Sequence, residues 1–170
     1  MLTGDEIRRR GIIADASLPE RQFQPNGVDL TLDCLWRIAG GGTIPADPDK
    51  PTIPQREVLV FDHDGWVSLP TGTYALRYRE ETRFPTDCGG LVFPRSSLLR
   101  MGVFIPTAVW DAGYNGRGES LMVVLNTEGV RVRYGARVAQ LVVFLLTGET
   151  IPYSGTYQRE NLLGPSRGEE

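Results

Sequence analysis

Histidine, lysine and cysteine are scarce in this chain. Among 170 residues there is one histidine, His63, one lysine, Lys50, and two cysteines, Cys34 and Cys88. His63 stands in Phe-Asp-His-Asp-Gly-Trp, a predicted turn, so a Ser-His-Asp triad is not expected. A structural zinc site lacks the four Cys and His ligands that it needs. The zinc-dependent deaminase signature, His-x-Glu with Pro-Cys-x-x-Cys, is also missing.

Long apolar runs and blocks of like charge are missing too. The net charge is −3, which argues against binding nucleic acid through a basic face. No apolar run approaches the roughly 20 residues that cross a bilayer, and the first residues lack the apolar centre of a signal peptide. We therefore predict one cytoplasmic domain with no membrane or nucleic-acid partner, in which both cysteines are buried thiols.

What is present is a series of short β-rich runs separated by glycine and proline. A capping box at Thr3–Glu6 predicts a helix over about 5–10, and Ser96–Met101 predicts another helical turn or two, capped by its serines. Residues 28–38 alternate as a half-buried strand does, and 40–55 is a predicted loop. Further strands are expected near 57–61, 65–69, 73–79, 89–93, 120–125, 129–133 and 137–146. Together they predict an all-β barrel or sandwich over residues 1–147, followed by a tail, 148–170, that leaves the main body.

Two groups within residues 91–118 suggest chemistry on a phosphorylated small molecule. Arg95, Ser96 and Ser97 follow an apolar strand, and a guanidinium, two hydroxyls and helix-start amides suit an anion. Asp111 leaves an apolar strand for a glycine-bracketed turn, where a carboxylate can act as a general base for water. We expect one hairpin to bring the two groups together. Each group alone has a simpler explanation, a helix cap with a surface arginine or an ordinary Asp-Gly turn.

Two polar residues in apolar strands raise a further question. Gln140 lies in Ala-Arg-Val-Ala-Gln-Leu-Val-Val-Phe, where an unpaired amide would cost a few kcal/mol. It is either satisfied within the sheet or reaches a ligand. Asp29 is similar, since it either holds a turn or pairs with an arginine.

Five motifs in order resemble the trimeric dUTPase and dCTP deaminase superfamily, and specifically its archaeal dUTPase branch. They span about residues 22–158 and are Gln24–Leu30, Pro94–Leu98, Ala108–Gly116, Gly135–Leu141 and Tyr153–Gln158. The resemblance implies a dUTPase-like distorted jelly-roll β-barrel with one or two short helices, and a homotrimer with active sites between subunits. It also implies hydrolysis of dUTP to dUMP and pyrophosphate, with Mg²⁺ held mainly by the substrate triphosphate rather than by protein ligands.

The resemblance further implies a role for each matched residue. Asp111 would activate the attacking water, and Asp29 would support the metal-bound water or the framework of the site. Tyr114 would pack against the deoxyribose and exclude a 2′-hydroxyl. The remaining residues would bind substrate: Arg95, Ser96, Ser97 and Gln140 at the phosphates, Ala108 and Trp110 in the uracil-reading hairpin 108–116, and Tyr157 and Gln158 from the closing tail. The tail lacks the arginine- and glycine-rich ending of the usual dUTPase, and the position of Arg159, outside the matched motif, is the only basis for the suggestion that it replaces the missing positive charge.

A zinc-independent dCTP deaminase, or an enzyme with both activities, is the alternative. Such deaminases share the Arg-Ser-Ser-Leu-x-Arg pattern that ends here at Arg100, and they carry a glutamate three residues before an asparagine. Counting back from Asn126 gives Val123, which cannot transfer a proton. The loop before this strand is about two residues longer than usual, however, so Glu119 is a second candidate for that position.

Overall fold

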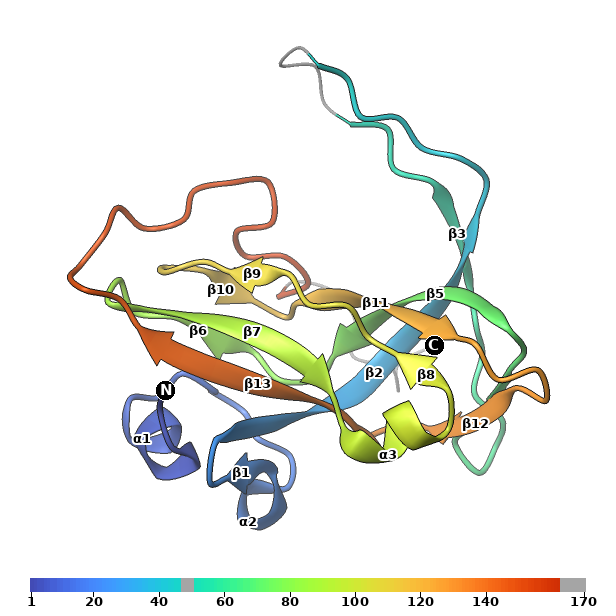
Figure 1. Cartoon of the computed structure of the whole chain (residues 1–170), viewed down its shortest axis with the longest axis horizontal. Helices are drawn as coiled ribbons and strands as arrows, with labels where there is room; N and C mark the ends of the chain where they lie inside the picture. The colour runs from blue at the N-terminus through green and yellow to red at the C-terminus, as the bar shows by residue number, and fades with distance from the viewer. Residues whose placement is uncertain (47–50, 163–170) are drawn as a thin grey trace.

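A computed structural model describes residues 1–46 and 51–162 as a strongly curled β-sheet with short helices at its edges (Figure 1). In the described residues the main sheet has nine strands. Seven follow one another in the order β8 (Val103–Phe104), β11 (Glu119–Val124), β5 (Gly72–Tyr78), β2 (Gly27–Ala39), β13 (Arg137–Leu145), β7 (Cys88–Pro94) and β9 (Val109–Trp110), and β1 (Phe23–Gln24) and β3 (Gln55–Val58) pair with β2. The prediction of a mainly β fold with short helices is confirmed. In the same residues, no helix is long and apolar enough to cross a membrane. The cytoplasmic location stays a prediction.

The longer strands lie where the alternation of apolar and polar residues predicts them. The central strands are β2 (Gly27–Ala39), β5 (Gly72–Tyr78), β7 (Cys88–Pro94), β11 (Glu119–Val124) and β13 (Arg137–Leu145). Their inward side chains, including Leu30, Leu76 and Leu141, are fully buried in one core. The remaining strands are β1 (Phe23–Gln24), β3 (Gln55–Val58), β4 (Trp66–Leu69), β6 (Thr82–Arg83), β8 (Val103–Phe104), β9 (Val109–Trp110), β10 (Asn115–Gly116) and β12 (Val130–Arg133).

The helices only partly follow the prediction. Helix α1 (Gly4–Arg9) begins at the predicted cap, where the Glu6 amide donates to Thr3 Oγ1 over 3.2 Å. Helix α2 (Pro19–Gln22) was not predicted, and it has no side-chain cap. Helix α3 (Ser96–Arg100) is present, but its cap residue is Arg95 and no side chain caps it. The prediction that serines cap α3 is therefore wrong: they occupy its first two helical positions.

The predicted loop joins β2 to β3, and the end of β2 (36–39) pairs with β3 in an arm that projects from the body of the molecule (Figure 1). In its described part, Thr43 and Thr52 exchange two backbone hydrogen bonds of 3.1 and 2.9 Å. Residues 47–50 of this loop and 163–170 of the predicted tail lie outside the described residues.

Candidate active site

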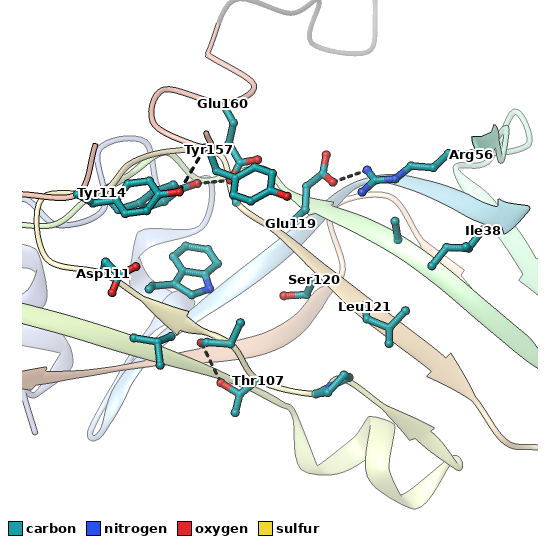
Figure 2. Close-up of a pocket in the computed structure, with 17 residues that line it drawn as sticks. Ile38, Arg56, Thr107, Asp111, Tyr114, Glu119, Ser120, Leu121, Tyr157 and Glu160 are labelled. Carbon is teal, nitrogen blue, oxygen red and sulfur yellow. Dashed lines mark hydrogen bonds and ion pairs between the residues drawn. The ribbon is translucent and has the colours of Figure 1, made fainter. Parts of the chain in front are cut away.

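A cavity of about 540 Å³ opens between the hairpin β9–β10, the start of β11, the base of the arm and the C-terminal tail. Asp111 lies at one end of this pocket and Ile38 and Arg56 at the other (Figure 2). Six of the predicted site residues line it, namely Ala108, Trp110, Asp111, Tyr114, Glu119 and Tyr157. The pocket therefore unites the predicted hairpin, the second candidate glutamate and one of the two tail residues.

Asp111 is the exposed carboxylate of this pocket. It directly follows β9, and its backbone carbonyl accepts a bond of 3.1 Å from the Tyr114 amide, which closes the turn. Its side chain makes no hydrogen bond or ion pair within the described part of the chain, and it also borders a second hollow below the tail. A carboxylate with this freedom can accept a proton from a water molecule beside it.

Aromatic rings build the wall next to Asp111. Trp110 is buried, and its ring packs edge-on against Tyr114 with 5.5 Å between the ring centres. Tyr78 and Phe84 pack on the same indole. Gly118 lies under the indole, where a Cβ atom would collide with the ring. Rings locked from several sides give a rigid, apolar surface that suits the flat face of a nucleobase or a sugar.

The tail packs against this hairpin through backbone groups. The Tyr153 amide donates to the Ala112 carbonyl (2.8 Å), and the Arg159 amide donates to the Asn115 carbonyl (2.7 Å). Gln158 accepts from the Asn115 amide over 2.8 Å and donates to the carbonyls of Gly113 and Tyr153, both over 2.9 Å. Residues 153–161 of the predicted tail thus dock on the hairpin of their own chain.

The charged side chains of the pocket are mostly acidic. Glu119 forms an ion pair with Arg56, which comes from the arm (Figure 2). Glu160 reaches in from the tail and accepts a hydrogen bond of 2.8 Å from the Tyr114 hydroxyl. Burial raises the pKa of Glu160, and the neighbouring charge of Glu119 raises it further, although the Tyr114 bond acts in the opposite direction. This end of the molecule does not favour a polyanion.

The predicted phosphate-binding residues form a separate group around Asp29. Asp29 is 2% exposed, and its Oδ2 lies 3.1 Å from Arg95 Nε and 3.1 Å from Arg137 Nη1. Burial raises the pKa of Asp29, while the two guanidinium groups pull it down. Of the two roles open for Asp29, pairing with arginine is the one observed. Both arginines remain partly exposed, so their outer faces are available to an anion.

Other predicted residues lie near this arginine pair. Ser96, Ser97 and Arg100 are exposed on α3. Gln140 pairs with Asp29 across the β13–β2 ladder. The side-chain amide of Gln140 makes no hydrogen bond to any described residue. Gln140 is half-buried rather than enclosed, so water or a ligand can reach it.

The prediction that one hairpin brings Arg95 and Asp111 together is wrong within a single chain. Strands β7 and β9 are antiparallel, with Gly90 opposite Trp110. Asp111 is therefore beside the beginning of β7, whereas Arg95 follows its end. Six residues of strand separate the two positions, about 20 Å at ~3.3 Å per residue. Figure 1 shows α3 and the hairpin turn at opposite ends of β7.

Sequence reasoning missed three residues of these groups. Arg137 lies inside the matched motif Gly135–Leu141, but its role depends on the pairing of β13 with β2, which brings it to Asp29. Arg56 carries no local signal, since it reaches the pocket from the arm. Glu160 stands two residues after the matched motif that ends at Gln158. Its closeness to that motif is the only feature of the sequence that could have marked it as a site residue.

The position that would carry a deaminase glutamate, Val123, lies on β11 outside the pocket. Strand β11 pairs with β5 without a break from Glu119 to Val124, so the extra length of the loop does not fall inside this strand. Glu119 thus stays four residues, about 13 Å, from Val123. Val123 pairs with Phe104 and Thr73 and does not line the pocket. Glu119 does line it, held by Arg56.

The sequence and the fold are similar to those of known proteins. A model of the dCTP deaminase-like family matches residues 1–146. Probable deoxyuridine 5′-triphosphate nucleotidohydrolases of Methanosarcina barkeri and Archaeoglobus fulgidus are each 40% identical to this chain, over 95% of it and 98% of their own length. A 2′-deoxycytidine 5′-triphosphate deaminase structure from Agrobacterium tumefaciens has a TM-score of 0.65 at 22% identity, covering 85% of this chain and 48% of that one. The chain belongs to the dCTP deaminase-like family.

Proposed function

We propose that this protein hydrolyses dUTP to dUMP and pyrophosphate, with Asp111 as the general base. The observation that carries the proposal is a free carboxylate at the rim of a pocket walled by the aromatic hairpin. The archaeal relatives that match almost the whole chain are named as nucleotidohydrolases of deoxyuridine triphosphate, which supports the same reaction here.

Charge decides which end of the nucleotide each group binds. Asp111, Glu119 and Glu160 line the pocket with a single arginine, Arg56, so the pocket suits the uncharged base and sugar. The triphosphate needs cations and donors, which Arg95 and Arg137 supply together with the hydroxyls of α3. We assign uracil and deoxyribose to the pocket and the phosphates to the Arg95 group.

A complete site then requires two copies of the chain. Asp111 and Arg95 lie at opposite ends of β7, but dUTP must touch both groups at once. Between residues 93 and 109 five large apolar side chains are exposed: Phe93, Leu99, Met101, Phe104 and Val109. Such a concentration of exposed apolar groups is typical of a subunit interface. We propose a homotrimer in which Arg95 of one subunit faces Asp111 of the next.

The proposed reaction needs one base and no covalent intermediate. Asp111 takes a proton from water, the water oxygen attacks the α-phosphorus, and the bond from that phosphorus to the bridging oxygen breaks to release pyrophosphate. Arg95, Ser96, Ser97 and Gln140 hold the phosphate oxygens as charge develops on them. Asp29 keeps Arg95 and Arg137 in place, which is the framework role predicted for it.

A magnesium ion fits this arrangement as a partner of the substrate. Among the described residues, no three His, Cys, Asp or Glu side chains converge as a metal cage. The triphosphate oxygens are hard ligands of the kind that Mg²⁺ prefers, so the substrate itself would hold most of the coordination sphere of the ion. When bound, Mg²⁺ would offset phosphate charge during the attack.

Tyr114 is proposed to exclude a 2′-hydroxyl, because its buried ring lines the pocket beside Asp111. Tyr157 lies on the same rim. Gln158 is harder to assign to substrate, since its amide already makes three bonds to the hairpin and the tail. Its contribution is to fasten the tail. Arg159 is exposed, and its suggested contact with phosphate stays a prediction.

The decisive assay offers dUTP and dCTP separately with Mg²⁺ and measures both pyrophosphate and ammonia. We expect pyrophosphate from dUTP and no ammonia from dCTP. Glu119 is the one feature that keeps the deaminase alternative open, because it lines the pocket although β11 keeps it away from position 123. Ammonia release would make Glu119 and Arg100 the residues to test next. Without pyrophosphate from dUTP it would replace the proposed reaction, and together with pyrophosphate it would indicate an enzyme with both activities.

A further inference from the structure

Glu160 enters the pocket because the tail turns sharply on both sides of it. Arg159 and Asn161 adopt left-handed backbone conformations, with φ of 63° and 57°. Asparagine tolerates this region, but arginine rarely enters it, at a cost of roughly 1–2 kcal/mol. Backbone strain of this kind persists where the surrounding contacts favour it. Here it directs a carboxylate toward the hairpin.

The contact that Glu160 makes inside the pocket is with the Tyr114 hydroxyl, over 2.8 Å (Figure 2). Its backbone also contributes, since the Glu160 carbonyl accepts from the Arg117 amide over 3.1 Å. Glu119 is the other carboxylate nearby, but it pairs with Arg56 and lies 3.4 Å from Asn161 Nδ2. The two acidic side chains thus have separate partners, and Glu160 is the one that holds the phenol.

The other contacts of Tyr114 fix its ring but leave the hydroxyl to Glu160. Trp110 packs on one side, and Tyr153 packs edge-on with 6.1 Å between the ring centres. At Gly116 a Cβ atom would stand only 2.7 Å from the Tyr114 hydroxyl, so the backbone has come as close as glycine permits. The ring is packed by its neighbours, and the tail sets the position of the oxygen.

We propose that Glu160 is a positioning residue for nucleotide selectivity: its carboxylate holds the Tyr114 phenol in the orientation that excludes a 2′-hydroxyl. This inference rests on the proposed function, because it assumes that Tyr114 faces the sugar. The docked tail would then contribute to the selectivity for dUTP over UTP in addition to covering the pocket. Loss of the Glu160–Tyr114 contact should lower this selectivity even when the hairpin stays intact.

The test compares kcat/KM for dUTP and for UTP in the full-length protein and its variants. Glu160→Ala and Tyr114→Phe remove the same hydrogen bond from its two sides. Each should reduce the preference for dUTP over UTP by about tenfold, the effect of a hydrogen bond to a charged group. Because they remove one shared interaction, the double variant should be no worse than either single one.

Two further variants separate positioning from a general effect on the tail. Glu160→Gln keeps an oxygen that accepts from the phenol, so it should retain the selectivity within about twofold. Glu149→Ala removes an exposed carboxylate of the same tail and should change nothing. Unchanged selectivity in Glu160→Ala, or additive losses in the double variant, would overturn the inference.

An exchange measurement gives a readout that does not need turnover. Loss of the side-chain bond should loosen the strained turn 159–161, so the Arg117 amide should exchange its hydrogen about tenfold faster in Glu160→Ala and Tyr114→Phe. Glu149→Ala and Glu160→Gln should leave that rate unchanged. If the wild type fails to hydrolyse dUTP, the proposed function fails by itself, and this rate alone decides whether Glu160 holds Tyr114. Equal rates in all variants would refute that contact.

Discussion

The two ends of strand β7 offer opposite chemical environments. Beside its first residues lies a pocket with three carboxylates, aromatic walls and one arginine. After its last residue, a buried carboxylate holds two arginines whose outer faces meet solvent. One end suits the neutral part of a nucleotide and the other suits its phosphates. In one chain the two ends of β7 lie too far apart to bind the same nucleotide. This distance is the main structural reason to expect that the enzyme is an oligomer.

The ends also differ in how they are held. Backbone hydrogen bonds from the tail fasten the Asp111 end, and several of them run to residues of the hairpin turn. The Arg95 end is held by side chains, through the ion pairs of Asp29. The first end therefore depends on the tail, whereas the second is held by contacts within the body of the protein.

Replacing Asp111 by asparagine should have the largest effect. Asparagine keeps the size of the side chain but cannot accept a proton from water at neutral pH, so pyrophosphate release from dUTP should fall by about 10²–10⁴-fold. The carboxylate makes no bond to any described residue, so melting temperature and dUTP binding should stay near the wild-type values. Turnover near the wild-type rate in this variant would remove Asp111 from the proposed role.

Mixing two inactive variants tests whether the two ends meet across subunits. One variant carries Asp111→Asn and the other Arg95→Gln, and the subunits are allowed to exchange. A site between subunits is intact when each contributes its native residue, so an equal mixture should recover about a quarter of wild-type activity (½ × ½) in a closed ring. If the mixture is no more active than its separate components, both residues act within one chain.

The sequence predicted the strands better than it predicted the meeting of the two ends. Alternation over many residues identifies β2 and β13, but two-residue strands such as β8, β9 and β10 contain too few positions to show a period. Pairing of β7 with β9 decides that Asp111 returns to the start of β7, and the spacing of Arg95 and Asp111 along the chain carries no information about that register.

The missed residues have a similar explanation. Arg137 acts through a cross-strand contact with Asp29, and Glu160 acts through a turn in which Arg159 takes an uncommon conformation. Neither feature has a pattern in the local sequence. The family motifs predicted roles for Asp111 and Tyr114, whereas the role proposed for Glu160 depends on where the tail docks.

A methyl group added at Gly118 should weaken the Asp111 end specifically. A Cβ atom there would collide with the Trp110 indole, which other rings hold in place. Gly118→Ala should therefore cost about 1–3 kcal/mol of unfolding free energy, a fall of roughly 2–10 °C in melting temperature. Gly148→Ala is the matched control, since no atom lies within 4 Å of the added carbon. Equal melting temperatures for the two variants would mean that the indole moves freely and the wall is not rigid.

The smallest expected effect concerns the surface ion pairs that support the start of β7. Arg10 donates to Glu6 over 2.9 Å and to Asp87, the residue before β7, over 2.8 Å. Hydrogen bonds from Arg9 and Arg10 lower the pKa of Glu6 to about 2 from an ordinary 4.5. A carboxyl group with a lowered pKa stabilises the fold at pH values above its pKa in the unfolded chain, and that contribution is lost as the pH falls from about 4.5 to about 2.

Glu6→Gln should thus lower the melting temperature by about one or two degrees at pH 7, because exposed pairs are weak. The difference from the wild type should shrink below pH 4.5. A difference that stayed constant down to pH 2 would show that the two arginines do not depend on the charge of Glu6.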